Sequence, residues 1–334
     1  MADDDPLSDV GEHAFLDALC RRLRNGQGRF SSRIAIGPGD DAAVVRPSGR
    51  PLVMTTDALV EGVHFRSGWL SPAELGARAA LLNLSDLAAM AAEPTNALLA
   101  VTAPSSFQAR QLDALIDGCA AALAEHGAAL VGGNLSRSPL LTLTLTAIGE
   151  LHGEPLRRDT ARPGDRLFVS GTLGDASAAL SFLLRDERPP EVLRSRWVAP
   201  TPRLELARRL AGAGVRTGLD LSDGLLVDTG HLCRASGVGA RLRLDHLPLS
   251  AAVRALDGRG VGFAIPGGED YELLLAVSPQ LVERITGIAR DLGTPLHEIG
   301  EIIEGSKVEL MGEDGRPLGP VEGFDHFHQA AVRP

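Results

Sequence analysis

Carboxylate and hydroxyl side chains gather in one glycine-bearing stretch of the sequence, residues 37–65. Two short apolar runs within it, 42–45 and 52–54, are separated by proline and glycine and predict a pair of strands. If these strands pair with each other, three carboxylates and two hydroxyls converge at one sheet edge: Asp40, Asp41, Thr55, Thr56 and Asp57. Carboxylates held this close repel one another and favour a cation, and hard oxygen ligands suit Mg2+ shared with substrate phosphates. The alternative is that the first two are turn residues and that Asp57 only ends a strand.

A second acidic stretch, residues 218–228, places Asp220, Ser222 and Asp223 after a short predicted strand and before a predicted helix. Its spacing differs from that of an EF-hand loop, which alternates acidic positions and closes on a distant Glu. Asp223 can alternatively be a helix N-cap. That role explains one carboxylate but leaves the pair unexplained.

A further carboxylate, Asp86, lies inside a predicted helix over residues 71–92. Ser71, Pro72 and Glu74 form a typical helix start with a capping box. Asp86 shares a face with Asn83 and has leucines around it, and an unpartnered carboxylate there is costly to bury. We therefore interpret Asp86 as a ligand; the alternative is that it lies on a solvated stripe or bonds to the next turn.

The composition is that of a globular protein with about two domains in 334 residues. A formal net charge of -10 and a pI near 5.4 argue against binding nucleic acid or an anionic membrane through bulk charge. The three cysteines have neither metal-site nor disulfide spacing, which favours a reducing compartment. Because the N-terminus is acidic and the apolar runs are shorter than the roughly 18 residues that span a bilayer, we predict a cytoplasmic protein without a membrane partner.

The chain contains a single lysine, Lys307, in a polar stretch without a glycine-rich loop. A Walker A loop and a protein kinase each need a lysine in a defined place, so both designs are excluded. If the protein handles phosphate, arginine and metal ions must neutralise it. Three arginines at the predicted domain boundary are either solvated charges or phosphate ligands: Arg157, Arg158 and Arg162.

The hydrophobic pattern predicts two α/β domains, 1–150 and 151–334. In the first we expect helices over 11–23, 71–92 and 106–126 and strands over 95–102, 128–131 and 140–148, the last with alternating Leu and Thr. A polar segment with two prolines, 151–163, marks the boundary. In the second we expect strands over 165–170 and 299–303, helices over 201–213 and 280–292, and a Pro-Gly-Gly turn before Glu269 and a long apolar strand.

Six motifs, in order, resemble the thiamine-monophosphate kinase family, of the superfamily that includes aminoimidazole ribonucleotide synthetase and selenophosphate synthetase. They are GDDAAVV (39–45), TTDALVEGVHF (55–65), NLSDLAAM (83–90), VGGN (131–134), DLSDGL (220–225) and GGEDYELL (267–274). The resemblance implies transfer of the ATP γ-phosphate to thiamine monophosphate. It also implies a homodimer in which strands of the two N-terminal domains form a barrel. The N-terminal domain is then expected to carry the metal and ATP site, and the C-terminal domain to complete the ATP and substrate sites.

The resemblance carries roles over to individual positions. Mg2+ ligands are expected at Asp41, Thr55, Thr56, Asp57, Asp86, Asn134, Asp220 and Asp223, of which Asp57, Asp220 and Asp223 are the candidate catalytic residues. ATP is expected at Gly133, Asn134, Arg158 and Ser222. Thiamine phosphate is expected at His64, Glu269 and Phe324. At Asn134 the family usually has Asp, so one metal site here carries less negative charge.

Two rival functions remain open. One is another ATP-dependent synthetase of the superfamily, although a selenophosphate synthetase needs Cys or Lys in an N-terminal glycine-rich loop, which this chain lacks. The other is a nucleotide- and metal-binding protein without catalysis, suggested by Asn134. Assay with thiamine monophosphate, ATP and Mg2+ discriminates among them.

Overall fold

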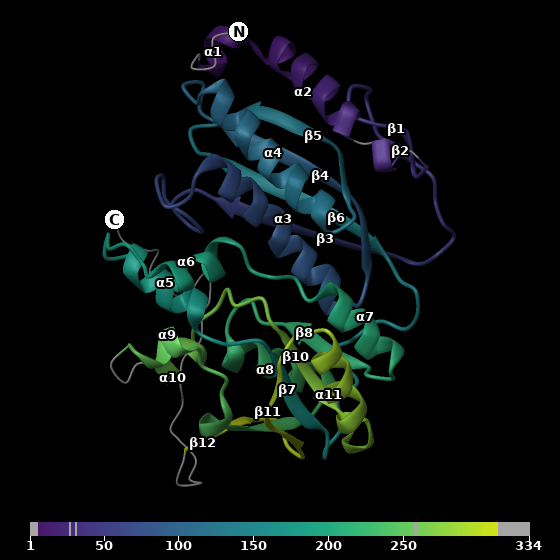
Figure 1. Cartoon of the computed structure of the whole chain (residues 1–334), viewed down its shortest axis with the longest axis vertical. Helices are drawn as coiled ribbons and strands as arrows, with labels where there is room; N and C mark the ends of the chain where they lie inside the picture. The colour runs from purple at the N-terminus through teal and green to yellow at the C-terminus, as the bar shows by residue number, and fades with distance from the viewer. Residues whose placement is uncertain (1–5, 27, 31, 257–259, 313–334) are drawn as a thin grey trace. The chain divides into compact units, whose positions relative to one another are not determined.

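The computed structural model describes residues 6–26, 28–30, 32–256 and 260–312, and these fall into two compact units (Figure 1). The first unit comprises the described residues up to Leu87 together with Glu93–Leu151. The second comprises Ala88–Ala92 and the described residues from His152 onward. Phe324 lies outside the described residues.

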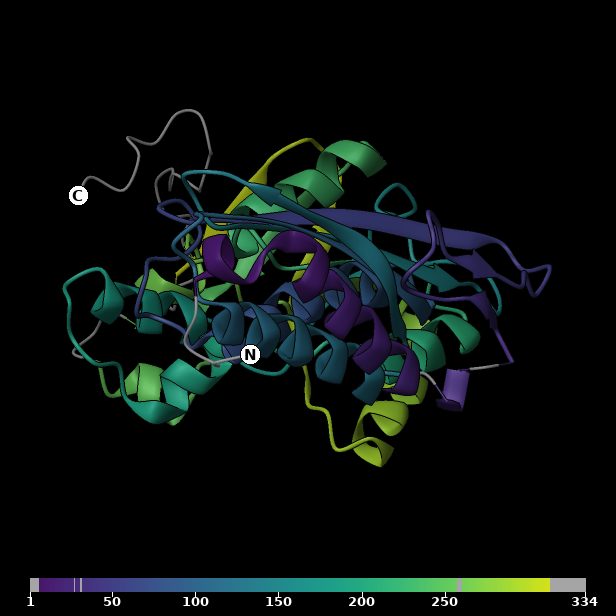
Figure 2. The ribbon, with the colours of Figure 1, turned by 90° about the horizontal axis from the view of Figure 1, so that it is seen from above.

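The first unit is built on a four-stranded sheet with the order β3-β6-β4-β5. The strands are β3 (Leu52–Val60), β4 (Glu93–Ala103), β5 (Ala129–Arg137) and β6 (Thr142–Glu150), and only β4 and β5 pair in parallel. Helices α3 (Pro72–Ala89) and α4 (Ala109–Glu125) cover one face of the sheet (Figures 1 and 2). The predicted Leu/Thr alternation of β6 is confirmed, because Leu143 and Leu145 are buried and the threonines that alternate with them are partly exposed.

The sheet is open within the described residues, with β3 and β5 at its edges. The N-terminal elements of this unit are α1 (Leu7–Val10), α2 (Glu12–Gly26), η1 (Gly28–Phe30), β1 (Ile34–Ile36) and β2 (Val44–Val45). The expected pairing of 42–45 with 52–54 is wrong, because β2 pairs with β1. Instead β3 pairs with β6 along all nine of its residues, and this long ladder satisfies its backbone groups better than the two-residue β2 could.

The Gly-Gly-Asn sequence at 132–134 is part of strand β5, which continues beyond the strand predicted for 128–131. The register between β4 and β5 shifts between Ala97 and Leu98, next to these glycines. A Cβ at Gly133 would lie 1.9 Å from the carbonyl oxygen of Leu99, so glycine is needed there for strand approach.

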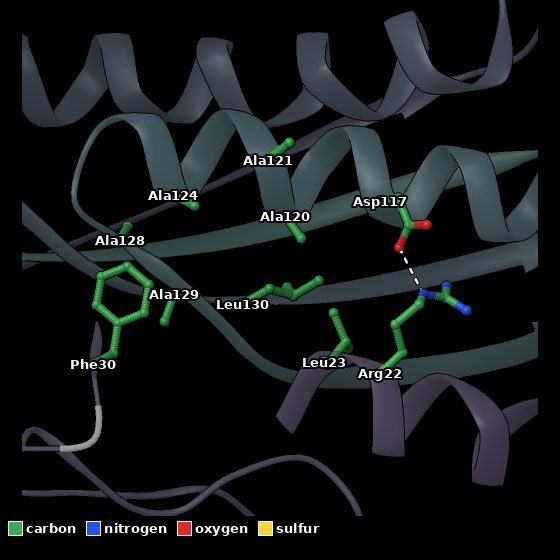
Figure 3. Close-up of a pocket in the computed structure, with 10 residues that line it drawn as sticks. All are labelled: Arg22, Leu23, Phe30, Asp117, Ala120, Ala121, Ala124, Ala128, Ala129 and Leu130. Atoms are coloured by element: carbon green, nitrogen blue, oxygen red, sulfur yellow. Dashed lines mark hydrogen bonds and ion pairs between the residues drawn. The ribbon is translucent and has the colours of Figure 1, made fainter. Parts of the chain in front are cut away.

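A groove of about 360 Å3 lies among α2, η1, α4 and β5 (Figure 3). Alanine side chains of α4 form much of its wall, and Arg22 Nε pairs with Asp117 Oδ1 at 2.9 Å at one end. None of the residues predicted to bind metal, nucleotide or substrate lines it.

The second unit is built on a six-stranded sheet with the order β12-β9-β11-β7-β10-β8. The strands are β7 (Arg166–Ser170), β8 (Thr217–Asp220), β9 (Gly239–Arg243), β10 (Leu273–Val277), β11 (Leu296–Ile303) and β12 (Val308–Met311). Alternate residues of strand β10, which lies between β7 and β8, enter two hydrophobic cores, with Leu273 and Leu275 in one and Leu274 in the other. The sheet is therefore buried on both faces, which explains the continuous apolar run of β10.

Helices α7 (Leu204–Gly212) and α11 (Val282–Asp291) contribute to the first of these cores, and α8 (Leu225–Ser236) contributes to the second. Four further helices complete the described part of this unit: α5 (Asp175–Leu183), α6 (Glu191–Val198), α9 (Ala251–Arg254) and α10 (Gly260–Ala264). Short 3-10 turns, η2 (Leu244–His246) and η3 (Pro279–Leu281), precede α9 and α11. Across the described ranges, no helix combines the length and the apolar character needed to cross a membrane.

Candidate active site

Strand β3 and helix α3 bring together three of the predicted ligands, Thr55, Asp57 and Asp86, which we call the strand-helix group. The Thr55 hydroxyl donates a hydrogen bond to Asp86 Oδ2 at 2.5 Å. The backbone N–H of Asp57 donates to Asn83 Oδ1 at 3.1 Å, so α3 is tied to β3 at two points one turn apart. The predicted capping box fixes the start of α3, since Ser71 N donates to Glu74 Oε2 and Glu74 N donates to Ser71 Oγ.

The two carboxylates of the strand-helix group repel each other. The pKa of Asp57 is raised to about 6, first because its carboxylate is partly withdrawn from water and second because Asp86 is negatively charged. The residue as a whole remains exposed, so the carboxylate is crowded by protein on one side while solvent reaches it on the other. Such a site is electrostatically suited to receive a cation.

Thr56 faces away from the strand-helix group because side chains alternate along a strand. Its hydroxyl donates to the Leu145 carbonyl at 3.1 Å and accepts from the Thr146 hydroxyl at 3.1 Å. Asn134 lies on this same face of the sheet, in the register row of Ala100 and Thr144, and its Nδ2 donates to Ser136 Oγ at 2.9 Å. Three inter-strand spacings of about 4.8 Å separate β5 from β3, so within one chain Asn134 stands about 14 Å along the sheet from that strand.

Two other predicted residues of the first unit have local contacts. Asp41 is exposed in the turn before β2, and its N–H donates to Asp40 Oδ1 at 2.9 Å. His64 follows β3, and its Nδ1 accepts a hydrogen bond from the Val60 N–H at 3.0 Å. That bond requires the Nε2–H tautomer of a neutral ring, so the histidine closes the turn that ends β3.

In the second unit, Asp223, Asp228 and His231 form a loop group at the start of α8, with one ligand atom of each within 4.8 Å of the others. Asp228 is buried, and its Oδ2 accepts from the N–H groups of Asp223 and Gly224 at 3.0 and 3.1 Å. The alternative reading of Asp223 as the helix cap is wrong, because Gly224 is the N-cap residue and no side chain caps it.

The loop group is also electrostatically strained. Burial, and then the charges of Asp223 and Asp220, raise the pKa of Asp228 to about 7, against the two N–H bonds that lower it. Asp220 itself is buried at the end of β8. Burial, and then the positive charges of Arg234 and Arg158, lower the pKa of His231. The imidazole is therefore neutral near pH 7 and can act as a metal ligand.

Arg158, a predicted ATP ligand, therefore lies within electrostatic reach of His231 in the loop group. Its backbone carbonyl accepts from Ser236 Oγ at 2.8 Å, which ties the segment to the end of α8. Arg157 forms an exposed ion pair with Asp159 at 2.5 Å. The solvated interpretation of Arg157 is supported by that pair.

Ser222 and Glu269 are brought together by backbone hydrogen bonds between two segments far apart in sequence. Glu269 N donates to the Ser222 carbonyl and Tyr271 N donates to the Leu221 carbonyl, both at 2.8 Å. A Cβ at Gly268 would lie 2.4 Å from the Ser222 carbonyl oxygen, so glycine is required at this approach. The predicted nucleotide position and the predicted substrate position thus share one rigid junction.

Sequence reasoning did not identify Asp228 or His231 as part of the site. Both lie on α8 three residues apart, a spacing that places them on one helix face and that could have drawn attention to them. The donor sets of both units consist of carboxylate and hydroxyl oxygens, with one imidazole in the loop group. Because hard divalent cations prefer oxygen ligands and the carboxylates present repel one another, the residues fit such an ion in each unit.

Both parts of the chain match known families. Residues 39–151 match AIR synthase related protein, N-terminal domain, and residues 162–313 match AIR synthase related protein, C-terminal domain. A thiamine-monophosphate kinase of Synechococcus elongatus is 39% identical over 340 residues, which cover 97% of this chain and 98% of that protein.

Solved structures give the same result. The crystal structure of thiamine-monophosphate kinase from Stenotrophomonas maltophilia K279a is 38% identical, with a TM-score of 0.83 over 90% of this chain and 97% of that one. AaThiL complexed with AMPPCP and TMP is 30% identical, with a TM-score of 0.75 over 97% of this chain and 99% of that one. The chain belongs to the thiamine-monophosphate kinase family, and its two halves are the N- and C-terminal domains of AIR synthase related proteins.

Proposed function

We propose that the protein phosphorylates thiamine monophosphate, transferring the γ-phosphoryl group of ATP to the substrate phosphate to give thiamine diphosphate and ADP. The observation that carries this proposal is the 39% identity to a thiamine-monophosphate kinase over almost the whole of both chains. The AaThiL complex supports it, because AMPPCP is an ATP analogue whose methylene group replaces the β,γ-bridging oxygen, and it is bound there together with TMP.

The cofactor that we propose is Mg2+. In the first unit its proposed ligands are the strand-helix group and Asp41, and in the second unit they are Asp220 and Asp223. Thr56 and Asn134 lie on the opposite face of the first-unit sheet, so we propose that they act as ligands on that face and not within the strand-helix group. Bound Mg2+ neutralises phosphate charge and helps to orient the reacting phosphates. The chain has no Walker A lysine, so Arg158 is the side chain that we propose to bind nucleotide phosphate, with the Ser222 hydroxyl and the backbone at Gly133 and Asn134 as further contacts.

The acceptor is a phosphate group that is largely deprotonated near neutral pH, so the reaction needs no general base on the protein. This agrees with the contacts of His64, whose Nδ1 is occupied by a backbone N–H. The proposed work of the chain is to bind, orient and balance charge: Glu269, His64 and Phe324 hold the thiamine moiety, and the carboxylates hold the cations.

We propose that the enzyme is a homodimer whose first-unit sheets associate into a barrel. The sheet face opposite α3 and α4 supports this, because it exposes apolar side chains among its threonines: Leu52, Met54 and Leu98. Such a face on an open sheet favours burial against a partner. A native mass of twice 35.0 kDa is expected, and a monomer at assay concentrations contradicts the proposal. The three free cysteines suit the reducing cytoplasm, which we propose as its location.

The test is an assay of the purified protein with thiamine monophosphate, ATP and Mg2+, with thiamine diphosphate measured by chromatography. Formation of thiamine diphosphate that stops on chelation by EDTA supports the proposal. Tight ATP binding without product indicates a non-catalytic homologue. Turnover only with formylglycinamidine ribonucleotide or with selenide in place of thiamine monophosphate indicates one of the related synthetases.

A further inference from the structure

The segment from Gly267 to Glu272 has an unusual backbone. Glu269 and Tyr271 have positive φ angles of 70° and 50°, in the left-handed region that costs a non-glycine residue about 1 kcal/mol or more. Gly267 and Gly268 lie so close to neighbouring atoms that a Cβ would be 1.9 Å from the Phe263 carbonyl oxygen and 2.4 Å from that of Ser222. Such a conformation persists only where surrounding contacts determine it.

Helix α6 supplies one of these contacts directly to the Glu269 side chain. The indole Nε1–H of Trp197 donates to Glu269 Oε2 at 2.7 Å. Trp197 has no exposed surface, and a buried indole N–H requires an acceptor. The carboxylate that we propose for thiamine binding is therefore set by a side chain 72 residues away and outside the six family motifs.

The neighbouring residue on α6 anchors the other end of the same segment. Arg196 Nη2 donates to Glu272 Oε1 at 2.5 Å, and Arg203, just before α7, donates to the same carboxylate through Nε and Nη2 at 2.7 and 2.5 Å. Ser170 Oγ donates to Glu272 Oε2 at 2.5 Å. Between these anchors, the buried Asp270 accepts from the Gly174 N–H at 2.8 Å. The segment is thus held at Glu269, Asp270 and Glu272, which leaves the Glu269 carboxylate little freedom.

We infer that Trp197 is a positioning residue for the thiamine substrate, acting through Glu269. The inference rests on the proposed function. Thiamine monophosphate carries a cationic thiazolium ring and an amino group on its pyrimidine, and a carboxylate is the natural partner of either. Because the indole N–H fixes one carboxylate oxygen, the orientation of Glu269 is set before substrate binds, and the ordering cost at binding is reduced.

The kinetic test uses Trp197→Phe, which keeps an aromatic ring in the core and removes the N–H donor. We expect the KM for thiamine monophosphate to rise about tenfold, the effect of losing one hydrogen bond to a charged group, while the KM for ATP stays within about twofold. Glu269→Ala raises the KM for thiamine monophosphate further. Combining Trp197→Phe with Glu269→Ala adds nothing more, because the indole acts through that carboxylate.

The hydrogen bond has a readout independent of turnover. The chain contains two tryptophans, so a 15N-labelled sample gives two indole N–H signals, and Trp197→Phe identifies the one from Trp197. Glu269→Ala should shift that signal upfield, and addition of thiamine monophosphate to the wild-type protein should move it again. Leu193→Met, a volume-conserving change at a buried position of the same helix, is the matched control and should leave both KM values unchanged.

Three outcomes overturn the inference: an unchanged KM for thiamine monophosphate in Trp197→Phe, additive effects in the double variant, or an indole signal that ignores Glu269→Ala. If Trp197 had a purely structural role, Trp197→Phe would lower the melting temperature without raising the KM for thiamine monophosphate more than the KM for ATP. If wild-type protein neither binds nor turns over thiamine monophosphate while the indole signal still responds to Glu269→Ala, the proposed function fails and the Trp197–Glu269 contact stands without a role in substrate binding.

Discussion

The strand-helix group and the loop group hold carboxylates by different means. In the strand-helix group, Thr55 and Asp57 follow the two-residue period of β3, and Asp86 follows the period of α3, so regular backbone geometry sets their positions. In the loop group, Asp223 lies in an irregular connection whose N–H groups are held by the buried side chain of Asp228. Removing a charge should therefore mainly reduce activity in the strand-helix group, whereas in the loop group it should reduce activity and also disturb the local structure.

The largest effect should follow from Asp57→Asn in the strand-helix group. We expect kcat/KM to fall about a thousandfold, because a group that balances charge in phosphoryl transfer is lost. The melting temperature in EDTA should stay the same or rise, since the change removes the repulsion between Asp57 and Asp86 and leaves β3 and α3 intact. Steady-state kinetics and thermal unfolding at one fixed pH measure the two effects.

Asp291→Asn is the matched control for that experiment, because Asp291 is an exposed aspartate at the end of α11 with a 3.6 Å ion pair to Arg209. It should change neither the rate nor the melting temperature noticeably. A melting temperature for Asp57→Asn that falls by many degrees would mean that the strand-helix group also depends on this carboxylate for its structure, and the contrast with the loop group would be lost.

A smaller effect, on stability, should follow from Asp228→Ala in the loop group. The change leaves the buried N–H groups of Asp223 and Gly224 without their acceptor, so the free energy of unfolding should fall by about 2 kcal/mol. Asp228→Asn keeps an acceptor oxygen and removes the repulsion from Asp223, so it should lose less than half of that amount. Denaturant titrations of the two variants measure the difference, and equal losses would show that the charge of Asp228, and not its acceptor role, stabilises the loop.

The same contrast explains what could be predicted from the sequence. Period-two and period-3.6 patterns identified β6, α3 and α4, and a continuous apolar run identified β10. The helical period also placed Asn83 and Asp86 on one helix face, because these patterns are properties of local sequence. The pairing partner of β2 was predicted wrongly, since pairing depends on which strand offers the longer ladder. Strands β9 and β12 were not predicted, because their short runs become strands only next to β11 and to each other.

Contacts between distant segments were the other gap. Trp197 contacts Glu269 in a way that no single-sequence pattern encodes, whereas Asp228 and His231 are close in sequence to Asp223 and could have been found from their shared helix face. Trp197 lies 72 residues from its partner Glu269. The left-handed conformation of Glu269 is likewise a product of the contacts on both sides of it, whereas the preceding Pro-Gly-Gly sequence indicated only a turn.

The smallest effect should follow from Asn134→Asp, which tests the position where the chain departs from its family. The Asn134 side chain now donates to Ser136 Oγ, and an aspartate can accept from that hydroxyl instead, so β5 should tolerate the change. The added charge should lower the Mg2+ concentration for half-maximal rate about threefold, because a carboxylate binds a divalent cation more strongly than an amide oxygen does. Ser136→Ala in the Asn134→Asp chain separates the charge from its support: if the gain persists, charge alone is responsible, and if it disappears, the serine orients the new ligand. An unchanged or higher Mg2+ requirement in Asn134→Asp would mean that position 134 does not face the metal. Its position on the sheet face opposite Asp57 would explain that result.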